Sequence, residues 1–148
     1  MDARPIGVFD SGIGGLTVVS EIFSQLPDER VVYLGDRARF PYGPKSSTTV
    51  TSFARDDCEF LLSNNVKLIV VACNTATAYS LPALISEFDV PVIGVVEPGA
   101  RAAANITNNG LIGVIGTDGT ISSEAYQKNI AAVDSGLSVF AKPCPLFV

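Results

Sequence analysis

The residue best suited to chemistry in this sequence is Cys73, which follows the apolar run 68–72 and precedes the polar residues Asn74 and Thr75. A cysteine placed where a buried strand gives way to a helix faces free backbone N–H groups and the positive end of the helix dipole. These groups lower the pKa of a thiol from about 8.5 into the range of roughly 3.5 to 7.5. The alternative is that Cys73 only fills space in the core. We favour an acidic thiol, because polar groups follow it directly along the chain.

An acidic thiol among hydroxyl and amide groups suits one reaction in particular, the removal of a proton from a carbon next to a carboxylate. Hydroxyls and backbone amides would hold the carboxylate while the thiolate takes the proton. Inversion of that carbon then requires a second acid on its opposite face. Asp10 follows the apolar run 6–9, and we expect it to lie beside Cys73 and to assist it as a proton acceptor.

The sequence contains no histidine and only three cysteines, Cys58, Cys73 and Cys144, which are widely separated. Without an imidazole, the chain offers no base for a Ser-His-Asp or Cys-His mechanism. Three scattered cysteines do not supply the four ligands of a structural zinc site, so we expect no bound metal. An odd number of cysteines also argues against a disulfide framework. We expect Cys58 and Cys144 to be structural.

The composition is that of a globular domain with an acidic surface. Hydrophobic residues make up 47% of the chain, and 15 acidic residues stand against 10 basic ones, for a net charge of −5. Because the basic residues are scattered, we expect no nucleic-acid partner. No apolar run approaches the roughly 18 residues that cross a bilayer, and the first residues do not resemble a secretion signal. We therefore expect no membrane association and a cytoplasmic location.

Short β-branched runs alternate along the chain with stretches in which apolar residues recur every three or four positions. This alternation predicts a parallel α/β sheet with right-handed crossovers. The expected strands are 6–9, 31–34, 68–72, 92–96, 111–115 and, with the least regular pattern, 137–140. The expected helices are 16–26, a segment that Ser46 or Ser47 caps and Asn64-Asn65 ends, a segment from about 75 that Pro82 kinks or restarts, 100–106 and 122–132.

Ligands of open parallel sheets bind beyond the carboxyl ends of the strands. Small polar or acidic residues follow every one of the first five expected strands, at 10–15, 36–43, 73–77, 97 and 117–120. Any single turn of this kind has a structural explanation, because Asp, Ser, Thr and Gly also cap helices. The whole set, with a cysteine in its middle, indicates a binding site at this edge of the sheet.

A nucleotide-binding module is the alternative interpretation of the first turn. Gly12 and Gly14 form the start of a dinucleotide fingerprint, and Asp36 stands where a ribose-binding acid would stand. The third glycine of that fingerprint is replaced by Thr17, and no lysine precedes Lys45 to complete a phosphate loop. The nucleotide interpretation stays open as the less favoured one.

Four longer motifs resemble those of the glutamate racemase family. In chain order they are GVFDSGIGGLT (7–17), GDRARFPYG (35–43), VACNTAT (71–77) and GVVEPGA (94–100). The resemblance implies that L- and D-glutamate are interconverted by two cysteines on opposite faces of the substrate. It implies no pyridoxal phosphate, metal or other cofactor, and a product that feeds peptidoglycan synthesis.

The same resemblance implies a fold and a division of the chain. Residues 1–97 would form an open three-layer, flavodoxin-like α/β lobe, incomplete without strands from the C-terminal part of the family's sequence. Residues 98–148 would begin a second, similar lobe.

Matched motif by motif, the resemblance assigns roles to residues of this chain. Cys73 would be the first of the two acid–base thiols, and Asp10 the carboxylate that assists it. Glutamate, a small-molecule substrate, would be bound by Ser11, Tyr42, Gly43, Asn74, Thr75, Thr117 and Thr120.

The family's second thiol belongs to a Gly-Cys-Thr-His motif that does not occur in these 148 residues, and Cys144 matches a different, non-catalytic segment. We therefore expect an N-terminal fragment or truncated product that binds glutamate weakly, does not racemise it alone, and could form a homodimer. Two further alternatives stay open. One is an aspartate or hydantoin racemase of the same superfamily, and the other is a non-catalytic piece with a dimerisation or regulatory role.

Overall fold

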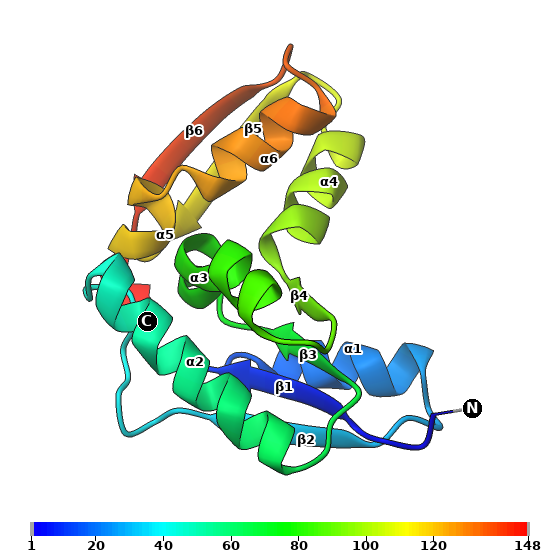
Figure 1. The fold of residues 1–148 in the computed structure, drawn as a ribbon. Coiled ribbons are helices and arrows are strands. Elements are labelled where there is room, and N and C mark those ends of the chain that lie inside the picture. Colours follow the sequence, from blue (N-terminus) through cyan, green and yellow to red (C-terminus); the bar gives the residue numbers. More distant parts are fainter. Residues whose placement is uncertain (1, 148) are drawn as a thin grey trace.

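The computed structural model describes residues 2–147 and contains two parallel sheets (Figure 1). The first sheet has the strand order β2-β1-β3-β4. Its strands are β1 (Ile6–Asp10), β2 (Val31–Gly35), β3 (Leu68–Val71) and β4 (Val92–Gly94). Ile6 of β1 is aligned with Val31 on one side and with Leu68 on the other. Because all four strands run in the same direction, their carboxyl ends meet at one edge.

Helices cover both faces of the first sheet. On one face, Val19 of α1 (Leu16–Gln25) packs with Val8 and Val70 of the sheet. On the other face, α2 (Ser47–Ser63) and α3 (Asn74–Glu87) pack on Phe9 and Val71. Side chains alternate between the two faces because successive residues of a strand point in opposite directions. The predicted parallel α/β fold with three layers is confirmed.

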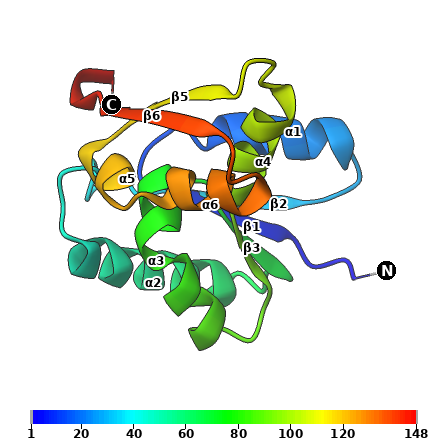
Figure 2. The ribbon, with the colours of Figure 1, turned by 90° about the horizontal axis from the view of Figure 1, so that it is seen from above.

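The second sheet consists of β5 (Leu111–Gly116) and β6 (Ser138–Pro143), which are parallel and in register. The helices α4 (Val96–Ile106) and α6 (Ala125–Val133) lie together on one side of it (Figures 1 and 2). Their core contact is made by Ala100, Ile112 and Ile130. The short helix α5 (Asp118–Ser122) follows β5, and a 3-10 turn spans Pro145–Phe147. The outward-facing residues of this sheet include Leu111, Ile115 and Phe140, all of them exposed.

Several boundaries differ from the sequence prediction. The third helix continues through Pro82, and Leu84 beyond the proline is fully buried, so core packing holds the segment helical. Strand β4 ends at Gly94, and the next helix begins at Val96 instead of 100. The helix expected over 122–132 begins only at Ala125, because Glu124 takes a left-handed conformation with φ 58°, and a separate short helix ends before it at Ser122.

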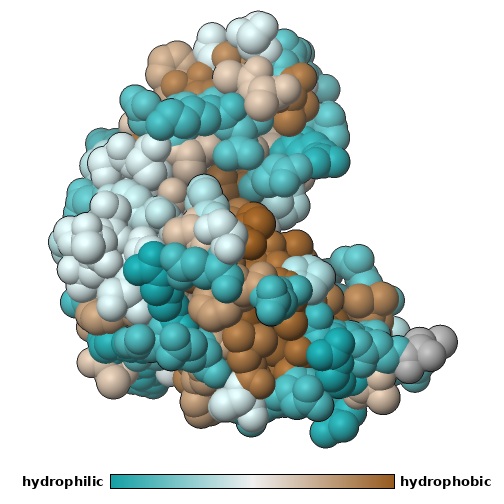
Figure 3. Space-filling model, viewed as in Figure 1, coloured by the Kyte–Doolittle hydropathy of each residue, from teal (hydrophilic) through white to brown (hydrophobic). Residues whose placement is uncertain are grey.

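A hollow of about 500–700 Å³ lies between α3, β4 and α4. Its lining is largely apolar and includes Leu81, Ile85, Ile93 and Pro98. Figure 3 shows apolar side chains gathered on this side of the molecule. Within residues 2–147, strand β4 pairs with β3 alone, and its residues Val92, Ile93 and Gly94 line this hollow. Among the helices of residues 2–147, none has the length and apolar character needed to cross a membrane.

Candidate active site

Cys73 occupies the junction that the sequence predicts, between the end of β3 and the first turn of α3. It is the N-cap of α3, and its Sγ accepts a hydrogen bond from the backbone N–H of Ala76 at 3.4 Å. The same sulfur donates to the hydroxyl of Ser11, 3.5 Å away, in the turn after β1. The thiol is 5% exposed. Two of the predicted site residues are therefore brought together from positions 62 residues apart.

The expected direction of the Cys73 pKa is wrong. Burial raises the pKa of this thiol above its ordinary value, and the nearby carboxylate of Asp10 raises it further. The N–H of Ala76 and the hydroxyl of Ser11 act in the opposite direction but are outweighed. The helix N-terminus is present as expected. The sulfur is simply too well shielded from water for its charged form to be favoured.

The carboxylate of Asp10 fills the glycine turn that follows β1. Its Oδ2 accepts hydrogen bonds from the backbone N–H groups of Gly12 (3.1 Å) and Gly15 (3.2 Å). A Cβ on Gly15 would lie 2.7 Å from the Cβ of Asp10, so only glycine allows this approach. A nucleotide phosphate would need the backbone N–H groups of this turn. Those of Gly12 and Gly15 are already bonded to the carboxylate of Asp10. This arrangement argues against the nucleotide-binding alternative.

Three threonines form a second polar group, which we call the hydroxyl cluster: Thr75 on α3, and Thr117 and Thr120 at α5. The Oγ1 of Thr75 lies 2.8 Å from that of Thr117 and 3.2 Å from that of Thr120. Thr117 caps α5 by accepting from the N–H of Thr120 at 3.1 Å. The cluster therefore joins α3, which packs on the first sheet, to α5, which follows β5 of the second sheet.

Asn74 lies beside this cluster on a cavity of about 400 Å³. The cavity lining also includes Thr117, Thr120 and Tyr126. The Tyr126 hydroxyl donates to Oδ1 of Asn74 at 2.8 Å. The amide of Asn74 is oriented by that bond, and Tyr126 is a supporting residue that the sequence prediction did not name.

Tyr42 and Gly43 lie in the loop between β2 and α2, and they face different surroundings. Tyr42 is 1% exposed, and its side chain packs in the core of the first sheet. Gly43 lies against α5: its carbonyl accepts from the N–H of Gly119 at 3.0 Å. A Cβ on Gly43 would lie 2.6 Å from the Cβ of Thr117.

A buried carboxyl group under this loop was missed by the sequence prediction. Asp57 of α2 is 1% exposed, and it is bonded to Arg39 and Tyr42. Asp36 shares both partners, so it is not free to bind a ribose. A signal for Asp57 exists in the sequence, since it lies three residues after Ala54 and four before Leu61, on the buried face of the helix.

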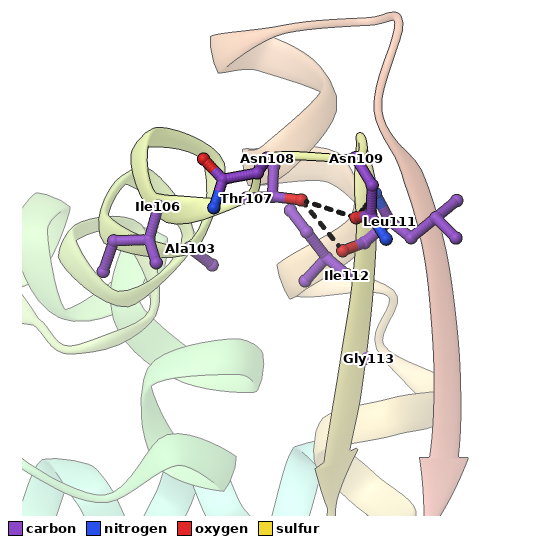
Figure 4. A pocket seen from close by; sticks show the side chains of 8 residues that line it. All are labelled: Ala103, Ile106, Thr107, Asn108, Asn109, Leu111, Ile112 and Gly113. Carbon is purple, nitrogen blue, oxygen red and sulfur yellow. Dashed lines mark hydrogen bonds between the residues drawn. The ribbon is translucent and has the colours of Figure 1, made fainter.

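A further hollow of roughly 500 Å³ lies at the turn between α4 and β5 (Figure 4). There the Thr107 hydroxyl lies 3.2 Å from Oδ1 of Asn109 and 3.1 Å from the carbonyl of Leu111. This hollow is at the amino end of β5, whereas the predicted site residues follow the carboxyl ends of strands. None of its eight lining residues is a predicted site residue. Within residues 2–147, no three His, Cys, Asp or Glu side chains are grouped as metal ligands.

Residues 6–144 match the model of one protein family, described as Asp/Glu/hydantoin racemase. The chain belongs to this family. It is 54% identical to the glutamate racemase of Oceanobacillus iheyensis over 145 residues, which cover 98% of the chain and 53% of that protein. The predicted resemblance to glutamate racemases is confirmed.

Solved structures of the Asp/Glu/hydantoin racemase family share the fold. A glutamate racemase isoform from Bacillus anthracis superposes with a TM-score of 0.95 at 51% identity, over 99% of this chain and 55% of that one. The glutamate racemase of Francisella tularensis, crystallised in complex with D-glutamate, gives a TM-score of 0.90 at 43% identity, again over 99% and 55%. The chain thus spans about half the length of the relatives that it matches.

Proposed function

We propose that this chain supplies one face of a glutamate racemase active site, in which Cys73 exchanges a proton with the α-carbon of glutamate. The observation that carries the proposal is the position of the Cys73 thiol. It caps a helix at the carboxyl edge of the sheet and is bonded to Ser11, the residue that follows Asp10. The D-glutamate complex of the Francisella tularensis relative supports glutamate as the ligand.

The neutral thiol needs an acceptor before it can act as a base. In the proposed step, Asp10 takes the proton from Sγ, and the resulting thiolate removes the proton from the α-carbon of glutamate. Ser11, Asn74 and the hydroxyl cluster would donate hydrogen bonds to the substrate carboxylates, together with the backbone at Tyr42 and Gly43. These donors stabilise the negative charge that develops next to the α-carboxylate.

Inversion of the α-carbon requires a second acid on the opposite face of the substrate. We place that acid in the part of the relatives that this chain does not match, and we divide the chain into parts of two lobes, residues 1–97 and 98–148. A reaction without cofactor, a cytoplasmic location, a homodimer and a role in peptidoglycan synthesis belong to the same proposal.

The proposal is tested by incubating the chain separately with L- and D-glutamate in D₂O and following the α-proton by NMR. A single acid–base group on one face can exchange the α-proton of one enantiomer with solvent without racemising it. We expect such exchange for one enantiomer, its loss in Cys73→Ser, and its retention in Cys144→Ser, which alters a cysteine outside the site. Exchange with neither enantiomer, or equal exchange in Cys73→Ser, would overturn the proposal. Sustained racemisation by these 148 residues would overturn the assignment of the second acid to another segment.

A further inference from the structure

The loop between β2 and α2 is anchored by one buried tyrosine that contacts two carboxyl groups. The Oη of Tyr42 lies 2.5 Å from Oδ2 of Asp36 and 2.9 Å from Oδ2 of Asp57. A phenol has a single proton to donate, and an ionised carboxylate has none. Both contacts are hydrogen bonds only if one of the two carboxyl groups carries a proton and donates it to the phenol.

The number of donors on each oxygen indicates which carboxyl group carries the proton. Oδ2 of Asp36 accepts from both Nε of Arg39 and Oη of Tyr42, as an ionised oxygen does. Within residues 2–147, Oδ2 of Asp57 contacts the phenol alone, while Arg39 bonds the other oxygen of that group. We therefore assign the proton to Asp57, so that Tyr42 donates to Asp36 and accepts from Asp57. We call Asp57, Tyr42 and Asp36, in that order of donation, the proton chain.

The charges around the proton chain point the same way. Arg39 donates from Nε to Asp36 at 2.5 Å and from Nη2 to Asp57 at 2.8 Å. Its third bond goes to Asp56, which is exposed and solvated. One guanidinium therefore faces two buried carboxyl groups, and the buried set is electrically neutral only if one of them is protonated. An unpaired buried charge is costly.

The other titratable side chains near α2 do not bond to Asp57. The elements that contact α2 carry titratable side chains of their own on β1, β2 and α3, namely Asp10, Tyr33, Tyr79 and Glu87. Among residues 2–147, none of these four forms a hydrogen bond with Asp57. Glu87 is paired with Arg55 of α2 instead, at 2.5 Å. Asp36, Arg39, Tyr42 and Asp56 are thus the groups that govern the protonation of Asp57.

The proton chain fixes the position of Tyr42 and therefore of the next residue, Gly43, which contacts α5. Gly43 follows Tyr42 directly, accepts from the N–H of Gly119, and lies against the side chain of Thr117. A displaced Tyr42 would move Gly43 relative to the hydroxyl cluster.

We propose that Asp57 is a positioning residue, which in its protonated form donates a hydrogen bond to Tyr42 and thereby fixes the turn that carries Gly43. That this turn contacts glutamate rests on the proposed function; its position does not. Burial raises the pKa of Asp57 to about 6, which agrees with the geometry.

The protonation of Asp57 is measured by ¹³C NMR of the aspartate side-chain carboxyl carbons across a pH titration. We expect one aspartate of the wild-type chain to titrate with a pKa of about 6. That signal should be missing in Asp57→Asn and retained in Asp56→Asn, the matched change of a neighbouring carboxylate on the same arginine. A wild-type titration in which every aspartate has an ordinary pKa would overturn the proposal. Survival of the raised titration in Asp57→Asn would do the same.

Positioning is measured separately, as hydrogen exchange of the Gly119 amide that bonds to Gly43. Asparagine retains a donor for Tyr42 and an acceptor for Arg39, so Asp57→Asn should keep the wild-type protection, while Asp57→Ala should lower it about tenfold or more. In the wild type, protection should also fall as the pH rises from about 5 to about 8, and this fall should be missing in Asp57→Asn. If Asp57→Ala does not fold, the comparison of wild type with Asp57→Asn still decides. Identical pH dependence in those two proteins would refute the positioning role.

Both measurements are made without glutamate. A chain that passes them but does not exchange the α-proton of glutamate would refute the proposed function and leave the role of Asp57 standing.

Discussion

Replacing Gly43 with alanine tests how closely the β2–α2 loop approaches α5. The added Cβ would lie 2.6 Å from the Cβ of Thr117 and 2.8 Å from its Cγ2. Ordinary carbon–carbon contacts are about 3.5–4.0 Å, so the loop and α5 must separate by about 1 Å. Gly43 does not have a positive φ, so an alanine there is free of backbone strain and the effect reports the contact alone.

The expected cost follows from measured overpacking effects. Forcing extra carbon atoms into a packed contact destabilises a protein by about 1–3 kcal/mol. For a chain of this size, the melting temperature should fall by roughly 3–10 °C. The bond between the Gly119 N–H and the Gly43 carbonyl should also lengthen, because it spans the same contact. We therefore expect weaker protection of the Gly119 amide in the same variant.

The assay is urea unfolding followed by far-UV circular dichroism, with a matched glycine as control. Gly113→Ala adds the same methyl group at a position in β5 where nothing lies within 4 Å. That change should leave the stability unchanged or raise it by about 0.5–1 kcal/mol, because glycine is unfavourable inside a strand. The double variant Gly43→Ala/Thr117→Gly removes the clashing atoms, so Gly43→Ala should cost about 1 kcal/mol less in that background.

Two results would refute this reasoning. One is a Gly43→Ala variant as stable as Gly113→Ala. The other is an equal cost of Gly43→Ala with and without the Thr117 side chain, which would show that the loss arises elsewhere.

Two further predictions concern buried titratable groups. Iodoacetamide should modify Cys144, which is partly exposed, well before it modifies Cys73 and Cys58. Cys73 and Cys58 are both buried, and burial raises their pKa values, that of Cys58 to about 12. A mass spectrum in which Cys73 is alkylated first would contradict this. Between about pH 4 and 6 the free energy of unfolding should fall by up to about 3 kcal/mol through Asp57, because the folded chain keeps a proton there that the unfolded chain has already released. Urea unfolding at the two pH values should show a change in the wild type that is lower than the change in Asp57→Asn by up to about 3 kcal/mol.

Sequence reasoning located the first sheet well because its strands are apolar on both faces. Residues 68–71 form a strand whose last three members are buried, as a continuous β-branched run predicts. The break between α5 and α6 could not be predicted, because residues 122–132 are compatible with one continuous helix. Only the folded chain shows that Glu124 leaves the helical conformation.

The orientation of the Tyr42 side chain also could not be predicted from the sequence. Its motif marks the loop as part of a site, but an irregular loop has no periodicity from which a side-chain direction could be inferred. Of the two partners that bond the phenol, Asp36 lies at the start of the same loop and Asp57 lies on α2. Asp57 itself was predictable as a buried carboxylate from its helical spacing, whereas its bond to Tyr42 was not.

The sign of the Cys73 shift depends on two effects of unequal size. A helix N-terminus stabilises a nearby negative charge by about 0.3–1 kcal/mol, and by up to about 2 kcal/mol when partly buried. Full burial can raise the pKa of an acid by about 3–5 units, each worth about 1.4 kcal/mol. Burial therefore outweighs the helix, and the thiol stays neutral until a nearby group accepts its proton. In the proposed reaction that group is Asp10, whose Oδ2 is held by two backbone amides and whose Oδ1 forms no hydrogen bond within residues 2–147.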